Sequence, residues 1–195
     1  MRVAPLTFLE ATLALIRRER EHVRGGRPAG IVVKINALFD REVIEALYEA
    51  SRDGVPIRLI VRGICALRPG TPGLSESVRV KSVVGRYLEH SRIFCFRNGG
   101  GDDGEVYIGS GDWMMRNLRE RVEVMAPVRD AGLRTRLMHI LAVYWADNTA
   151  TRWMRPDGGY ERARPAPGET AVNAQEWFMR EAAGETPPEI PDLWV

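Results

Sequence analysis

Apolar residues recur at helical spacing near the start of the chain. Leu9, Leu13 and Ile16 share one face of a helix, and Thr7 and Glu10 have the spacing of a capping box at its beginning. Two glycines at 25 and 26 then interrupt the pattern. The sequence therefore predicts an amphipathic first helix that ends before these glycines.

The next apolar pattern is that of a strand, a helix and a second strand. Residues 29–36 read AGIVVKIN, which is nearly continuous and β-branched, as in a buried parallel strand. Asp40 is placed to cap a helix that Gly54 ends, and residues 55–61 form the next strand. This order is that of the right-handed crossover unit of an open sheet, so the pattern predicts an α/β fold.

Further strand patterns follow a loop rich in proline and glycine. They cover residues 78–84, 91–97, 105–109 and 121–127. The glycines and aspartates of NGGGDDG, residues 98–104, suit a hairpin or a longer turn. Apolar spacing then predicts a packed helix over residues 133–144. From Arg152 the sequence predicts a surface tail with one short helix near residues 171–183.

Composition adds few constraints to this pattern. The 195 residues are 45% hydrophobic and 28% charged, as in one ordinary globular domain. A formal net charge of +2 is too small to indicate a nucleic-acid-binding protein. The start, MRVAPLTFLE, lacks the segments of a signal peptide, and no apolar run reaches the ~18 residues of a transmembrane span. We therefore expect neither a nucleic-acid partner nor a transmembrane segment.

Both cysteines lie in apolar, strand-like sequence. Cys65 and Cys95 have neither the paired spacing nor the histidine neighbour of a zinc site. They are predicted to be free, buried thiols in a reducing cytosol.

Polar residues follow the first two predicted parallel strands. Ligands of open α/β sheets gather at the carboxyl ends of strands, where Asn36 and Arg62 lie in this sequence. The planar donors of arginine match two phosphate oxygens, although a solvated surface arginine is the more common case. Their positions make Asn36 and Arg62 candidates for an anion site.

His90 begins another apolar run and is the main candidate for catalysis. An imidazole can move a proton or attack phosphorus near neutral pH. The polar residues that the sequence places around it are Glu89, Arg92, Ser110, Asp112, Arg116 and Asn117. Of these, Arg92, Ser110, Asp112 and Asn117 are candidates to support it, together with Asn36. His139 falls on the polar side of its predicted helix and His22 lies near the end of the first helix, so both are predicted to be solvated. No cluster of carboxylates predicts a metal site in this chain.

Five runs of sequence, in order along the chain, carry a resemblance to a known family. They read VKINAL (33–38), LIVRGICALRPG (59–70), VGRYLEHSRIFCF (84–96), VYIGSGDWMMRNL (106–118) and RVEVMAPV (121–128). Over about residues 1–180 the chain resembles the C-terminal catalytic region of bacterial polyphosphate kinase, in the family that synthesises long chains.

The resemblance implies a fold similar to that of phospholipase D. We expect an α/β/α sandwich with a mixed, largely parallel sheet over residues 1–165. Residues 166–195 are expected to form a C-terminal tail with a short helix that packs on the same domain.

The resemblance also implies an activity, reversible transfer of the terminal phosphoryl group of ATP to polyphosphate. In that family a histidine of the preceding catalytic domain carries the phosphoryl group, and no counterpart of that domain is expected in this chain. His90 would contact the nucleotide phosphates and handle a proton, and Arg62 would bind ATP phosphate. The isolated chain is expected to bind phosphate without full activity.

Further expectations follow from the same resemblance. Mg²⁺ would arrive with ATP, held mainly by regions outside this chain. The expected partners are ATP or ADP, polyphosphate, the preceding catalytic domain and, in the full-length enzyme, further copies in a homo-oligomer. The expected location is the cytoplasm, with attachment to the periphery of the inner membrane left open.

Two other functions remain open. A phospholipase D-type phosphodiesterase or nuclease, acting as a dimer, would need a lysine two residues after its histidine and an aspartate seven residues after it. Arg92 and Arg97 occupy these positions, and Arg97 reverses the expected charge. The other alternative is a non-catalytic module that binds polyphosphate.

Overall fold

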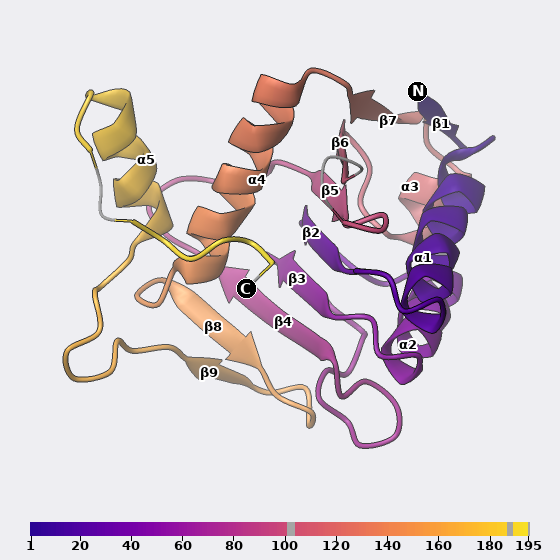
Figure 1. Ribbon diagram of the computed structural model, residues 1–195, viewed down its shortest axis with the longest axis horizontal. Coiled ribbons are helices and arrows are strands. Elements are labelled where there is room, and N and C mark those ends of the chain that lie inside the picture. The colour runs from indigo at the N-terminus through magenta and orange to yellow at the C-terminus, as the bar shows by residue number, and fades with distance from the viewer. Residues whose placement is uncertain (101–103, 187–188, 195) are drawn as a thin grey trace.

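One mixed sheet organises the chain. In the computed structural model, which describes residues 1–100, 104–186 and 189–194, nine strands pair in the order β1-β7-β6-β5-β2-β3-β4-β8-β9. The strands are β1 (Arg2–Ala4), β2 (Ile31–Ile35), β3 (Ile57–Val61), β4 (Val78–Val83), β5 (Ile93–Phe96), β6 (Glu105–Gly109), β7 (Glu123–Val128), β8 (Thr151–Met154) and β9 (Tyr160–Arg162). Figure 1 shows β8 and β9 extending the sheet beyond β4.

Helices cover both faces of this sheet, as the predicted sandwich requires. They are α1 (Phe8–Arg24), α2 (Arg41–Arg52), α3 (Met115–Arg119), α4 (Ala131–Ala146) and α5 (Ala174–Ala182). In Figure 1, α1 and α2 lie together on the right, and α4 and α5 lie apart from them. Two separate clusters of buried side chains show that these pairs pack on opposite faces.

The alternation of side chains along the central strands divides the core between the two faces. On β2, Val33 faces α1 and α2, whereas Val32 belongs to the cluster that contains α4 and α5. Each face of β2 thus buries apolar side chains, which explains the nearly continuous hydrophobic run in the sequence. The segment after residue 165 contributes Val172 and Trp177 to the second cluster.

The expectation of a largely parallel sheet is wrong. Among the described strands only β2–β3 and β3–β4 pair in parallel, and the other six pairings are antiparallel. A parallel pair needs a crossover connection. In the first half of the chain α2 supplies it between β2 and β3, and the irregular residues 62–77 supply it between β3 and β4. After β4 the chain builds the sheet outward mainly by antiparallel neighbours.

Local signals in the sequence had mixed outcomes. The Asp40 carboxylate accepts a hydrogen bond from Val43 N at 3.2 Å, which confirms the predicted cap. The capping box at Thr7 is wrong, because the Thr7 hydroxyl accepts from Val3 N at 3.0 Å instead of capping α1. Of the predicted turn over residues 98–104, residues 101–103 lie outside the described part of the chain.

Short strands account for the other differences. The three residues of β1 were not expected, and β8 and β9 replace part of the predicted surface tail. Strands of three or four residues are too short for an alternating pattern to stand out in sequence.

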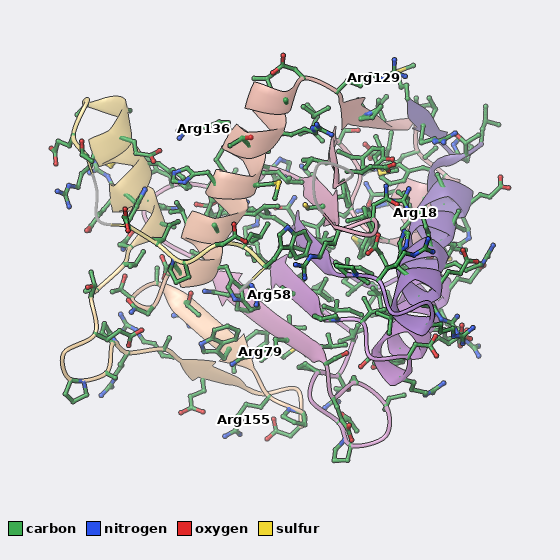
Figure 2. The ribbon with its side chains drawn as sticks, viewed as in Figure 1. Arg18, Arg58, Arg79, Arg129, Arg136 and Arg155 are labelled. Carbon is green, nitrogen blue, oxygen red and sulfur yellow. The ribbon has the colours of Figure 1, made fainter. Side chains whose placement is uncertain are left out.

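Basic and aromatic side chains pack together where β8 joins the sheet. Arg58 and Arg79, labelled in Figure 2, come from β3 and β4 and lie over the rings of Trp145 and Trp153, respectively. Lys81 is fully buried beside the same two rings, and its Nζ donates to the carbonyl oxygens of Trp145 and Asp147 at 2.8 Å each. Burial lowers the pKa of Lys81 to about 7, although Asp147 opposes this shift.

Candidate functional site

The predicted site residues gather at one edge of the sheet. Asn36 follows β2 and Arg62 follows β3, which run parallel. His90 precedes β5 and Asp112 follows β6; both lie at the same edge because β5 is antiparallel to its neighbours β2 and β6. The topology therefore brings together four residues that are distant in sequence.

Asp112 is buried and connects two of the other candidates. Its Oδ1 accepts hydrogen bonds from Asn36 N at 2.7 Å and Asn36 Nδ2 at 3.3 Å. Arg92 donates to the same carboxylate, through Nε at 3.2 Å and Nη2 at 3.0 Å. Both members of this ion pair are largely removed from solvent. Removing one partner of such a buried carboxylate would leave its charge uncompensated and would destabilise the folded state.

Arg92 also contacts His90, which is exposed. Arg92 Nη1 lies 2.9 Å from His90 Nδ1 and donates to the His90 carbonyl oxygen at 2.7 Å. Arg92 Nη2 also lies 3.5 Å from His90 Nε2, so the guanidinium group lies beside both ring nitrogens. Arg92 therefore connects the buried Asp112 carboxylate to the accessible His90 imidazole and helps to orient that ring.

The side chain of Arg62 is available to a ligand. Its backbone is fixed on both sides, since Arg62 N donates to Ile35 O at 3.2 Å and Ser82 Oγ donates to Arg62 O at 2.9 Å. Among the residues that the structure describes, none forms an ion pair or side-chain hydrogen bond with its guanidinium group. Arg62 lines a hollow of about 330 Å³ with the segment from Val83 to Glu89.

Ser110 and Asn117 belong to an adjoining group centred on Glu123. The Ser110 hydroxyl and Asn117 Nδ2 both donate to the Glu123 carboxylate, the latter at 2.6 Å. Ser110 Oγ also accepts from Val124 N at 3.1 Å. These contacts fix the turn that leads to Asp112, and in the described residues neither side chain forms a hydrogen bond with His90 or Arg62.

A buried ion pair that the sequence did not predict lies behind His90. Lys34 Nζ lies 3.1 Å from Glu89 Oε2 and donates to Ser91 Oγ at 2.8 Å. Burial lowers the pKa of Lys34, and Glu89 opposes that shift. A lysine within the otherwise apolar run of residues 29–36 was a signal for such a pair, because a buried ammonium needs an acceptor. Its partner could not be identified from the sequence.

The cysteines and the other two histidines lie outside this group of site residues. Cys65 and Cys95 are free, as predicted, but only Cys95 is buried and Cys65 is partly buried. Removal from solvent raises their pKa values, to about 11 for Cys65 and about 12 for Cys95. The predicted solvation of the other histidines is wrong. His22 Nε2 lies 3.0 Å from Asn98 Oδ1, and His139 Nε2 lies 2.5 Å from Glu181 Oε1, and both rings are partly buried.

The carboxylates at the site are already engaged. Asp112 is bound by Arg92 and Asn36, Glu89 by Lys34, and Glu123 by Asn117. Within the described residues there is no group of three or more His, Cys, Asp or Glu side chains that could hold a metal ion. No helix in the described part of the chain has the length and apolar character to cross a membrane. The site therefore offers cations and an imidazole, which suit an anionic ligand.

Comparison with known proteins identifies the family. The family described as polyphosphate kinase C-terminal domain 2 matches residues 1–175. A polyphosphate kinase from Thermosynechococcus vestitus is 53% identical over 177 residues, which cover 91% of this chain and 24% of that protein. The crystal structure of polyphosphate kinase from Porphyromonas gingivalis matches with a TM-score of 0.88 at 42% identity, covering 93% of this chain and 28% of that one.

A more distant structure shares the fold. A phospholipase D family member, Nuc from Salmonella typhimurium, matches with a TM-score of 0.56 at 12% identity and covers 79% of this chain and 95% of its own. The predicted phospholipase D-like fold is therefore confirmed. The chain spans about a quarter of the length of the curated relatives that it matches. Its sequence and its fold together show that the chain belongs to the polyphosphate kinase family, in which it corresponds to C-terminal domain 2.

Proposed function

We propose that this chain supplies part of a phosphoryl-transfer site. The reaction is reversible transfer of the terminal phosphoryl group of ATP to inorganic polyphosphate, through a phosphohistidine on another region of the enzyme. The observation that carries this proposal is the position of the Arg62 guanidinium, at the same sheet edge as the exposed imidazole of His90 and without an ion-pair partner among the described residues. Membership in the polyphosphate kinase family supports the choice of substrates.

The two side chains would have different roles. Arg62 would donate two hydrogen bonds to phosphate oxygens and neutralise charge as the phosphoryl group moves. His90, whose exposed ring lies beside the Arg92 guanidinium, would contact the phosphate and donate or accept a proton there. Phosphoryl transfer depends mainly on positioning and charge neutralisation, which these groups can supply without a nucleophile of their own.

Mg²⁺ would enter this site with the nucleotide. The donor set does not fit a dedicated magnesium cage, because the nearby carboxylates already accept hydrogen bonds from protein donors. We therefore assign the metal to the ATP phosphates and to regions of the enzyme other than this chain.

We also propose partners and a cellular location for the chain. The chain would act beside the preceding catalytic domain, in an enzyme that forms a homo-oligomer. Two free thiols fit a reducing compartment, so we place it in the cytoplasm.

The decisive experiment measures ATP-dependent polyphosphate synthesis in three samples. We expect no synthesis by the chain alone, synthesis when it is mixed with the preceding catalytic region of a polyphosphate kinase, and a loss of roughly 10² to 10⁴ in rate when the mixture carries His90→Ala. Arg62→Ala should reduce the rate by about a hundredfold or more. Arg52→Ala is the matched control, because Arg52 is an exposed arginine at the end of α2 and should leave the rate unchanged.

Two results would contradict the proposal. Synthesis by the chain alone would show that it carries a complete site. An unchanged rate in the His90→Ala mixture would remove His90 from the chemistry. Hydrolysis of a simple phosphodiester by the chain, abolished by His90→Ala, would instead support the phosphodiesterase alternative.

A further inference from the structure

The wall of the hollow beside Arg62 is an irregular segment. Residues 84–89 connect β4 to β5 without helix or strand, and five of these six residues are exposed. This segment ends at Glu89, directly before His90. An irregular exposed segment next to a site needs fixed contacts if it is to hold a ligand in one position.

One glutamine of α5 supplies such contacts. Gln175 Oε1 accepts from Tyr87 N at 2.9 Å, and Gln175 Nε2 donates to Tyr87 O at 2.8 Å and to Glu89 Oε1 at 2.7 Å. Every hydrogen of the Gln175 amide is thereby used, and its oxygen has a partner. The contact is close, because a Cβ atom at Gly85 would lie 2.5 Å from Gln175 Oε1.

Glu89 connects this contact to the rest of the site. Its Oε2 accepts from the Tyr144 hydroxyl of α4 at 2.6 Å and lies 3.1 Å from Lys34 Nζ of β2. Gln175 completes the set from α5. Three elements that are distant in sequence therefore meet on the residue that precedes His90.

The position of Gln175 is itself well defined. Asn173 caps α5 by accepting from Gln175 N at 3.1 Å and Glu176 N at 3.2 Å. Ala174 N donates to Asp147 Oδ2 at 2.7 Å, which ties the start of α5 to the end of α4. The glutamine is buried and cannot swing away into solvent.

We propose that Gln175 is a positioning residue for the anion site. It holds the 84–89 segment against the sheet, so that the hollow beside Arg62 and the imidazole of His90 keep one arrangement. This inference rests on the proposed function, because the ligand it assumes is a phosphate chain. The C-terminal helix thus completes the site without contacting the ligand.

The three histidines allow a direct test in the chain itself. Gln175→Met keeps the length of the side chain and removes its hydrogen bonds. NMR resonances of the imidazole rings then report three places: His90 reports the site, His139 reports docking of α5 through Glu181, and His22 reports the opposite face. Tripolyphosphate affinity, measured by calorimetry, is the second readout.

We expect the His90 resonance to move while those of His139 and His22 stay, and the affinity for tripolyphosphate to fall roughly fivefold or more, as for the loss of one or two hydrogen bonds. Glu176→Met is the matched control, because Glu176 is the exposed neighbour on α5 and should change neither readout. An unchanged His90 resonance, or unchanged affinity, in Gln175→Met would overturn the proposal.

A second variant covers the case in which Gln175→Met releases the whole helix. Gly85→Ala pushes against Gln175 from the segment itself and leaves α5 intact. The double variant should be no weaker than the more affected single variant, because both changes break the same contact. Additive losses would overturn the proposal. Failure of the unaltered chain to bind tripolyphosphate would instead count against the proposed function, and the His90 resonance would still decide the role of Gln175.

Discussion

The charged residues at the site edge differ in whether the protein already satisfies them. Arg92 is committed to Asp112 and His90, whereas the guanidinium of Arg62 faces a hollow. Arg92 fixes the geometry of the site, whereas Arg62 has no ion-pair partner within the described part of the chain and is available to bind an anion. Without Arg92 the Asp112 charge would be buried without its counter-ion. We therefore expect the loss of Arg92 to disturb the local structure of the site in addition to any effect on the reaction.

Lys81 provides a prediction about pH at the scale of one residue. Burial lowers its pKa to about 7 in the folded chain, against about 10.4 in the unfolded chain. Between these values the unfolded state binds more protons, so the free energy of unfolding should rise with pH by up to about 1.4 kcal/mol per unit. Chemical denaturation at pH 7.5, 8.5 and 9.5 measures this slope.

Lys81→Met isolates the contribution of the lysine, because other titrating groups are shared with the unaltered chain. The difference in unfolding free energy between the two proteins should shift in favour of the unaltered chain as the pH rises from 7.5 to 9.5. A difference that stays constant over this interval would show that the ammonium keeps an ordinary pKa in the folded state.

Most residues of the site could be predicted from the sequence, including the buried Asn36 and Asp112, but the buried contacts of Glu89 could not. Arg62 and His90 could be predicted because strand ends and a resemblance both mark them. Glu89 was noted as a neighbour of His90, but its contacts with Lys34 and Gln175 join residues 55 and 86 positions apart. Such contacts form only when the sheet is assembled and α5 packs on it. No local pattern in the sequence therefore encodes them.

At the scale of elements, α5 is part of the sandwich and not a surface attachment. Trp177 is buried against the cluster that includes Leu141 of α4, and its Nε1 donates to Glu181 at 3.2 Å. Trp177→Ala should therefore lower the free energy of unfolding by roughly 3 to 5 kcal/mol, as for other large-to-small changes in a core. Urea denaturation followed by circular dichroism measures this loss.

Met179→Ala gives the comparison within the same helix. Met179 is exposed, and its replacement should change the stability by no more than about 0.5 kcal/mol. Equal effects of the two substitutions would mean that α5 contributes through its helical propensity and not through the packing of one face.

The elements themselves were predictable to different degrees. The unit from β2 to β3 follows from continuous apolar strands, a capped helix and a glycine stop, all of which are local. The direction of the later strands does not follow, since an antiparallel and a parallel strand can share one apolar pattern. The three-residue strands β1 and β9 are defined by their partners alone.

At the scale of the whole molecule, one sheet separates two hydrophobic clusters. β2 contributes Val33 to one cluster and Val32 to the other, so neither can lose its order without exposing the shared strand. We predict a single cooperative unfolding transition. The imidazole resonances of His22 on α1 and His139 on α4 should disappear at the same denaturant concentration.

Separate midpoints for these two resonances would contradict this view. An earlier loss of the His139 signal would show that α4 and α5 unfold from a sheet that α1 and α2 still cover. Such a result would make the C-terminal part of the chain a unit of lower stability.

The two faces of β2 and β3 also differ in when a growing chain can cover them. Their first face is closed by α1 and α2, which are synthesised by residue 52. Their second face, with Val32 and Ile60, is covered by α4, which begins at residue 131 and is synthesised later. During translation one face of these strands can therefore be covered early. The other apolar face stays exposed to chaperones, or to a neighbouring nascent chain, until α4 leaves the ribosome.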